Sequence, residues 1–253
     1  MQVQQVTCFG ARAGEGNPAL VVQGGPADEA ARQMFARDSG VSACVFIDGD
    51  VLDYYYPHMR SPLCLHATLA AAHVLFARQG SGKPITVATA LRGQDLSLSR
   101  EADELFVALR RQAVDAAAPA PELVAGLLEA PGLALESAPV VASVGSPKLL
   151  VEVKDSATLA ALRPDLARIV AWGKEAGING LYVYCQLSDG VYEGRNFNHL
   201  DPAQEDSATG VAAGALTALL GRAIRLHQGG GRCLIHTRID GDTILIGGHA
   251  AAA

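Results

Sequence analysis

The chain lacks the features that would assign it to a membrane, to nucleic acid or to a disulfide-rich class. No apolar run reaches the about 20 residues needed to span a bilayer. The 20 lysines and arginines are scattered and the net charge is -6, so there is no broad basic surface for nucleic acid. Five cysteines without CxxC spacing predict reduced thiols rather than a disulfide framework or a structural zinc site.

The first residues also lack the basic start and apolar centre of a signal peptide, and residues 1–6 alternate in the manner of a strand. We therefore expect a cytoplasmic protein with no membrane partner. A hydrophobic content of 49% with 18% charged residues is typical of a folded globular chain.

Two segments about 140 residues apart place small and polar residues before an alanine-rich apolar run. Residues 62–73 read PLCLHATLAAAH and residues 205–216 read EDSATGVAAGAL. The spacing predicts helices over 65–78 and 209–220, each presenting unpaired N–H groups and the positive end of its dipole. Two such ends facing one cleft would hold an anion such as a carboxylate.

Strand patterns surround both helices in the same order, which predicts two similar halves. A stretch rich in Ala, Pro and Glu between residues 115 and 139 suits a connection. We therefore expect an N-terminal half over 1–115 and a C-terminal half, including the connection, over 116–253. The active-site cleft is expected between them.

Several motifs together resemble the PhzF-like phenazine biosynthesis family. They are GNPALVV at 16–22, PLC at 62–64 with HATLA at 66–70, GRNF at 194–197, EDSATG at 205–210, HQGGGR at 227–232 and GGHA at 247–250. The resemblance implies the α+β fold of diaminopimelate epimerase, in which each of two halves wraps a β-barrel-like sheet around a central α-helix. It also implies an isomerase that needs no cofactor and shifts a proton in a small carboxylate-bearing molecule, with a homodimer as the plausible assembly.

The chain departs from the family pattern at four positions. The family has an acid/base Glu where this sequence has Ala43, and alanine cannot move a proton. Leu65 replaces a glycine before the histidine, Val211 stands where the family often has Ser, and Arg60 stands where many relatives carry Glu.

The remaining candidates for proton transfer are Asp206, which matches the family's second-half carboxylate, and His66 at a helix start. Either residue could instead only cap its helix. Cys64 could be an acidic thiol or a small buried apolar residue, and Arg60 could hold a carboxylate or be a solvated surface residue. His66 and His73 share a helix face without a third ligand, so no metal is predicted. The predicted contacts of a small anionic substrate are Ser42, Arg60, Cys64, Leu65, Ala67, Thr68, Ser207, Thr209, Gly210 and Val211.

Three functions follow for this scaffold. The first is a cofactor-independent isomerase in which Asp206 and His66 handle protons. The second is a ligand-binding protein that has lost proton transfer, because Ala43 replaces the family's Glu. The third is a lyase that uses a single general base.

Overall fold

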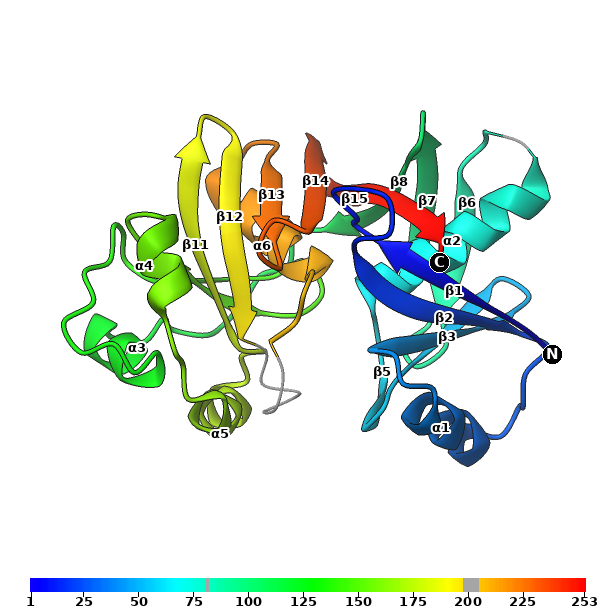
Figure 1. The fold of residues 1–253 in the computed structure, drawn as a ribbon, viewed down its shortest axis with the longest axis horizontal. Coiled ribbons are helices and arrows are strands. Elements are labelled where there is room, and N and C mark those ends of the chain that lie inside the picture. Colours follow the sequence, from blue (N-terminus) through cyan, green and yellow to red (C-terminus); the bar gives the residue numbers. More distant parts are fainter. Residues whose placement is uncertain (81, 198–204) are drawn as a thin grey trace. The chain divides into compact units, whose positions relative to one another are not determined.

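The computed structural model describes residues 1–80, 82–197 and 205–253 (Figure 1). The chain divides into two compact units, and we call the part formed by Met1–Leu109 and Leu245–Ala253 unit 1 and the part formed by Arg110–Ile244 unit 2.

Unit 1 is a closed barrel of eight strands around one helix. Its strand order is β1-β2-β3-β4-β6-β7-β8-β15, and pairing of β1 with β15 closes the ring. The short strand β5 pairs with β4 outside this path. The strands are β1 (Gln2–Cys8), β2 (Asn17–Gln23), β3 (Ala43–Asp48), β4 (Val51–Tyr56), β5 (Met59–Ser61), β6 (Ile85–Thr89), β7 (Asp95–Glu101), β8 (Glu104–Arg110) and β15 (Thr243–Ala252).

Helix α2 (Leu65–Gln79) packs against β1 to β4, and every residue of its first two turns, from Leu65 to Ala72, is buried. Because these turns are buried, the helix is apolar around its circumference. Its run of alanines allows the surrounding strands to approach closely. It ends at Gly80, whose positive φ of 63° forms the C-cap. Helix α1 (Glu29–Asp38) covers the outer face of β3 and β4, where Phe35 packs on Phe46.

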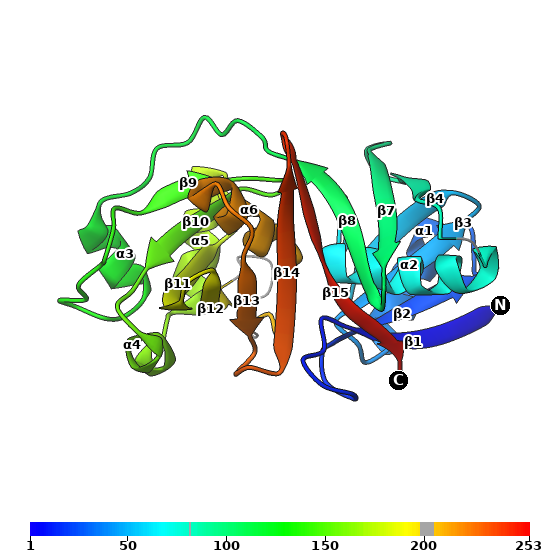
Figure 2. The same ribbon diagram turned by 90° about the horizontal axis from the view of Figure 1, so that it is seen from above.

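Unit 2 repeats this plan with additional helices. Its strands follow the order β14-β13-β12-β11-β10-β9, and helix α6 (Gly210–Leu220) packs against the end strands β14 and β9 as well as β10, so the sheet curls around it (Figure 2). The strands are β9 (Val140–Ala142), β10 (Lys148–Glu152), β11 (Leu181–Ser188), β12 (Val191–Phe197), β13 (Arg225–Gln228) and β14 (Cys233–Asp240).

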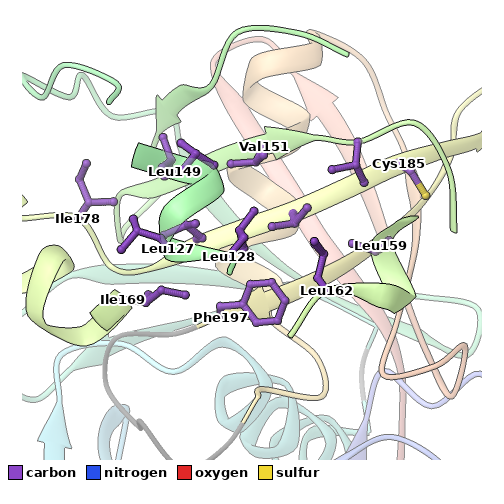
Figure 3. Close-up of a cluster of buried hydrophobic side chains, with 14 residues drawn as sticks. Leu127, Leu128, Leu149, Val151, Leu159, Leu162, Ile169, Ile178, Cys185 and Phe197 are labelled. Carbon is purple, nitrogen blue, oxygen red and sulfur yellow. The ribbon is translucent and has the colours of Figure 1, made fainter. Parts of the chain in front are cut away.

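The outer face of this sheet holds an apolar core covered by α3 (Pro121–Leu127), α4 (Ser156–Ala161) and α5 (Leu166–Ala176) (Figure 3). Leu149, Val151, Leu181 and Phe197 point into that core. Because side chains alternate along a strand, the residues between them face α6 instead. The expected fold, two halves that each wrap a sheet around a central helix, is thereby confirmed.

Candidate functional site

The start of α2 brings a thiol, an imidazole and a hydroxyl together in unit 1. Cys64 is the N-cap residue, with its Sγ 3.4 Å from Nδ1 of His66. The other ring nitrogen, Nε2, lies 3.3 Å from Oγ of Ser42. The Ser42 hydroxyl in turn lies 2.9 Å from Oδ1 of Asn17 and 2.9 Å from the carbonyl of Pro18. We call Cys64, His66, Ser42 and Asn17 the thiol–imidazole cluster.

The hydrogen-bond chemistry of the cluster defines a path for one proton. The Ser42 hydroxyl donates to Asn17 or Pro18, so its oxygen is available to accept a hydrogen bond from Nε2–H of His66. That tautomer leaves Nδ1 as an acceptor facing Cys64. A single proton can therefore sit on the sulfur or on Nδ1, which gives either a neutral pair or a thiolate and imidazolium.

Burial by itself raises the pKa of the Cys64 thiol, because a thiolate loses its hydration in an apolar surrounding. The nearby His66, a hydrogen bond from the Tyr56 side chain and the Ala67 backbone N–H all favour the thiolate and outweigh burial, so the Cys64 pKa lies below its ordinary value. The interpretation of Cys64 as a small apolar residue therefore accounts for its burial, but it omits the neighbouring groups that stabilise its thiolate.

The first turn of α2 is anchored to the barrel wall. The Thr68 hydroxyl donates to the Cys64 carbonyl at 2.8 Å, and the hydroxyl of Tyr54 on β4 lies 2.8 Å from the Thr68 oxygen. Thr68 and Ala67 are fully buried, and Leu65 is nearly so. These contacts fix the helix start, and they engage the Thr68 side chain within the protein.

Position 43 lies at the start of β3 on the face that looks toward α2. Val45, two residues on, is cross-strand from Tyr54, whose hydroxyl reaches α2, and alternation places Ala43 on the same side. Ala43 is buried and follows Ser42 directly. A carboxylate is therefore absent from this position beside the thiol–imidazole cluster.

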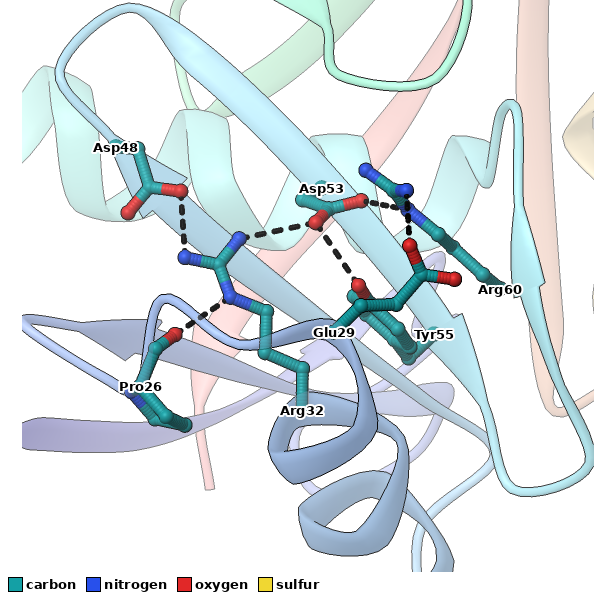
Figure 4. A network of polar contacts seen from close by, with 7 residues as sticks. All are labelled: Pro26, Glu29, Arg32, Asp48, Asp53, Tyr55 and Arg60. Atoms are coloured by element: carbon teal, nitrogen blue, oxygen red, sulfur yellow. Dashed lines mark hydrogen bonds and ion pairs between the residues drawn. The ribbon is translucent and has the colours of Figure 1, made fainter.

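Arg60 belongs to a network of charges beneath α1 (Figure 4). Its guanidinium donates to Asp53 at 2.8 Å and to Glu29 at 2.8 Å. Asp53, which is 3% exposed, also accepts from Arg32 at 2.9 Å and from the Tyr55 hydroxyl at 3.1 Å. The structure thus gives Arg60 two protein carboxylates as partners, a role that neither sequence interpretation anticipated.

In unit 2, the residues before α6 hold Asp206 in place. The Thr209 hydroxyl donates to Oδ2 of Asp206 at 2.5 Å, and Asp206 forms a β-bridge with Asn196. Gln228 clamps the segment, because its amide nitrogen donates to the Asp206 carbonyl at 2.7 Å and its oxygen accepts from the Thr209 backbone N–H at 3.2 Å. The Tyr182 hydroxyl donates to the same Gln228 oxygen at 3.2 Å.

The acidic neighbour of Asp206 has a separate partner. Both carboxylate oxygens of Glu205 accept hydrogen bonds from Arg195, at 2.9 and 2.7 Å. Arg195 also donates to the carbonyl of Leu159 on α4 and to that of Leu162, the C-cap residue of α4. Thr209 is the N-cap of α6 without a side-chain cap bond, and of the other predicted contacts here Gly210 is buried, whereas Ser207 and Val211 are half-buried.

Sequence reasoning missed four polar residues around Asp206. They are Tyr182, Lys148, Asn196 and Gln228, all of them at most 1% exposed. A polar residue inside an apolar strand pattern is the signal that could have found the first three. In the described ranges, no group of three or more His, Cys, Asp or Glu side chains is arranged to hold a metal ion.

Comparison with known proteins identifies the family. The model of the phenazine biosynthesis-like proteins, PhzC-PhzF, matches residues 6–237. The chain belongs to this family. Among its relatives are two bacterial proteins named as uncharacterized isomerases. YddE of Escherichia coli K12 is 31% identical over 100% of this chain and 86% of its own length, and PA2770 of Pseudomonas aeruginosa is 32% identical over 99% and 96%.

Solved structures agree with the fold of this PhzF-like protein. A predicted epimerase, PA4716 of Pseudomonas aeruginosa, superposes with a TM-score of 0.81 at 24% identity, over 99% of this chain and 96% of that one. A PhzF family protein of Bacillus anthracis gives a TM-score of 0.79 at 21% identity, over 100% and 98%. The family and the names of the relatives support an isomerase-type activity.

No helix within the described ranges has both the length and the apolar character required to cross a membrane.

Proposed function

We propose that this protein is a cofactor-independent isomerase that shifts a proton in a small carboxylate-bearing metabolite, with His66 and Asp206 as proton-transfer groups. The observation that supports it most directly is the thiol–imidazole cluster, in which Sγ of Cys64 lies 3.4 Å from Nδ1 of His66 at a helix N-terminus. The proposal includes that His66 and Asp206 act on the same substrate, in a cleft between the two halves.

The chemistry requires a base, an acid and a place for negative charge. The base removes a proton from the carbon next to the carboxylate, and the C–H electron pair is left as enolate-like charge. Backbone N–H groups at the starts of α2 and α6 stabilise that charge, as do oriented donors in other enzymes. The acid then delivers a proton to the opposite face or to a conjugated carbon, so the substrate is isomerised without net gain or loss of protons.

The substrate carboxylate is proposed to bind at these helix starts. In unit 1 the contributing positions are Ser42, Cys64, Leu65, Ala67 and Thr68. In unit 2 they are Ser207, Thr209, Gly210 and Val211. The proposal includes a homodimer, which the family resemblance implies, and a cytoplasmic location. Sedimentation analysis of the purified chain tests the homodimer.

The buried Ala43 favours a second function, a ligand-binding protein that has lost proton transfer. The two functions differ in a measurable way. An isomerase transfers deuterium from solvent into its ligand, whereas a binding protein is stabilised by the ligand and leaves it unlabelled.

The test follows deuterium incorporation by NMR into amino, hydroxy and dihydroaromatic acids. The isomerase proposal predicts incorporation by the wild type and its loss in Asp206→Asn and His66→Gln, with Asp103→Asn as the matched control at an exposed position. Incorporation that survives in both site variants would contradict the roles assigned to these residues.

A further inference from the structure

Three polar side chains share the inner face of the unit 2 sheet, where an apolar core would be expected. Leu149, Leu181 and Phe197 point outward into the apolar cluster, so their neighbours Lys148, Tyr182 and Asn196 point toward α6. Tyr182 and Asn196 are cross-strand partners on β11 and β12, and Lys148 lies on the adjoining β10.

Lys148 is a lysine with almost no access to solvent. It is 1% exposed, and the charge of Asp206 acts on its amine. Lysine is rarely buried this fully without a partner, since removing its charge from water is costly. Burial lowers the Lys148 pKa to about 7, with the Asp206 charge acting in the opposite direction.

Asn196 provides a second, independent sign of a missing ligand. It is 0% exposed, and neither its amide nitrogen nor its amide oxygen has a hydrogen-bond partner among the described residues. Buried polar side-chain atoms are normally paired with protein or ordered water, so two unpaired atoms on one side chain need an explanation. The backbone bridge between Asn196 and Asp206 places this amide beside the segment that carries one of the two proposed proton-transfer groups.

The buried amine of Lys148 and the unpaired amide of Asn196 define the chemistry of a ligand. A Lys ammonium and an Asn amide nitrogen both donate, so they suit the two oxygens of a carboxylate. The Asn amide oxygen accepts, so it suits a hydroxyl or amine carried near that carboxylate. A ligand with a carboxylate alone would leave the Asn196 amide oxygen unpaired. A ligand with an amide in place of the carboxylate would lose the charge interaction with the Lys148 ammonium.

We propose that Lys148 and Asn196 form a subsite of unit 2 that binds a carboxylate with a hydroxyl or amine on the adjacent carbon. The inference rests on the proposed function for its setting, because it places the substrate carboxylate next to Asp206. It adds to that function a substrate class, 2-hydroxy or 2-amino acids, and two residues that select for it.

Three probes of one shape test the subsite by calorimetry and NMR titration. Mandelate carries a carboxylate and a neighbouring hydroxyl, phenylacetate lacks the hydroxyl, and mandelamide lacks the charge. The wild type is expected to bind mandelate more tightly than the other two by about tenfold or more, which is the scale expected when a buried polar group loses its partner.

Two near-isosteric variants separate the contributions. Lys148→Met is expected to weaken mandelate binding about tenfold or more and to remove the preference over mandelamide. Asn196→Leu is expected to remove the preference over phenylacetate. The exposed Lys154→Met is the control and should bind as the wild type does. Circular dichroism of each variant verifies that it is folded.

Dependence on pH adds a readout that a structural role would not move. The charge that acts on Lys148 is that of Asp206. Tyr182 on the adjoining β11 and Glu152 on the same strand share its face of the sheet, and neither α6 nor β9 carries a titratable side chain. Mandelate affinity of the wild type should fall up to tenfold per pH unit above pH 7, and that fall should be absent in Lys148→Met.

Equal affinities for the three probes in the wild type, or no binding of mandelate, would overturn the subsite. Unchanged mandelate binding by Lys148→Met would do the same. The measurement is one of binding alone, so it can succeed where deuterium exchange fails, and the reverse. The fate of the subsite is thus separable from that of the isomerase.

Discussion

Replacing Asn196 by leucine should stabilise the unliganded protein, which is the reverse of what substitution of a fully buried residue normally does. Leucine has the same branched arrangement of heavy atoms as asparagine, although it is bulkier, and it brings no polar atom. The change removes an amide nitrogen and an amide oxygen that are both buried without partners. A buried unsatisfied group costs about 1–3 kcal/mol, so removing two, less the cost of refitting the side chain, should gain about 2 kcal/mol.

For a chain of this size that gain corresponds to a rise in melting temperature of about 4–8 °C. The assay is differential scanning calorimetry of the wild type and Asn196→Leu without ligand, with urea unfolding as a second measure. The matched control is Asn17→Leu. Asn17 is also buried, but its amide oxygen accepts from Ser42 at 2.9 Å, so this variant should be destabilised. A fall in melting temperature for both variants would refute the reasoning, since it would show that the Asn196 amide is paired.

Three further predictions concern the charges of the two units. Removing the imidazole in His66→Gln should raise the pKa of the Cys64 thiol, measured as thiolate absorbance against pH, because burial is then less well opposed. The folded protein releases the Lys148 proton near pH 7, whereas the unfolded chain keeps it to about pH 10.5. Because the unfolded chain binds more protons between these values, the free energy of unfolding should rise by about 1 kcal/mol per pH unit. Urea unfolding curves of Lys148→Met should show a flatter rise. Asp53→Asn should lower the free energy of unfolding by about 3 kcal/mol, because it leaves the buried Arg32 guanidinium with one carboxylate fewer.

Each of these predictions has a control and a contradicting result. Exposed His249→Gln should leave the thiol titration unchanged, and a Cys64 pKa that also stays constant in His66→Gln would contradict the first. Lys154→Met should keep the pH slope of the wild type, and a slope that survives in Lys148→Met would contradict the second. Glu29→Gln alters an ion pair whose carboxylate is 65% exposed and should cost less than about 1 kcal/mol; an equal cost for Asp53→Asn would contradict the third.

The helices were predictable because their signals are local. Alanine-rich runs preceded by small polar residues predicted helices over 65–78 and 209–220, and the structure has them at Leu65–Gln79 and Gly210–Leu220. The short strands β5 and β13 have no pattern of their own in the sequence, since each is defined by its pairing partners.

The side-chain partnerships were beyond the sequence because they join distant segments. Nothing in the spacing of Ser42 and His66 indicates that the two meet across the barrel. Lys148 lies in a strand whose remaining residues are mostly apolar, and its burial depends on α6, some 60 residues later in the chain. The clamp of Gln228 on Asp206 likewise depends on the curl of the unit 2 sheet.

We propose that this chain transfers a proton although it has alanine at position 43, where the family resemblance implies an acid/base Glu. The most direct test measures solvent deuterium incorporation by NMR for the wild type beside Ala43→Glu, with Ala43→Gln as the isosteric control for the added side chain. We expect incorporation by the wild type itself, dependent on Asp206. A silent wild type, with exchange appearing only in Ala43→Glu, would contradict it and identify the natural protein as a binder on an isomerase fold.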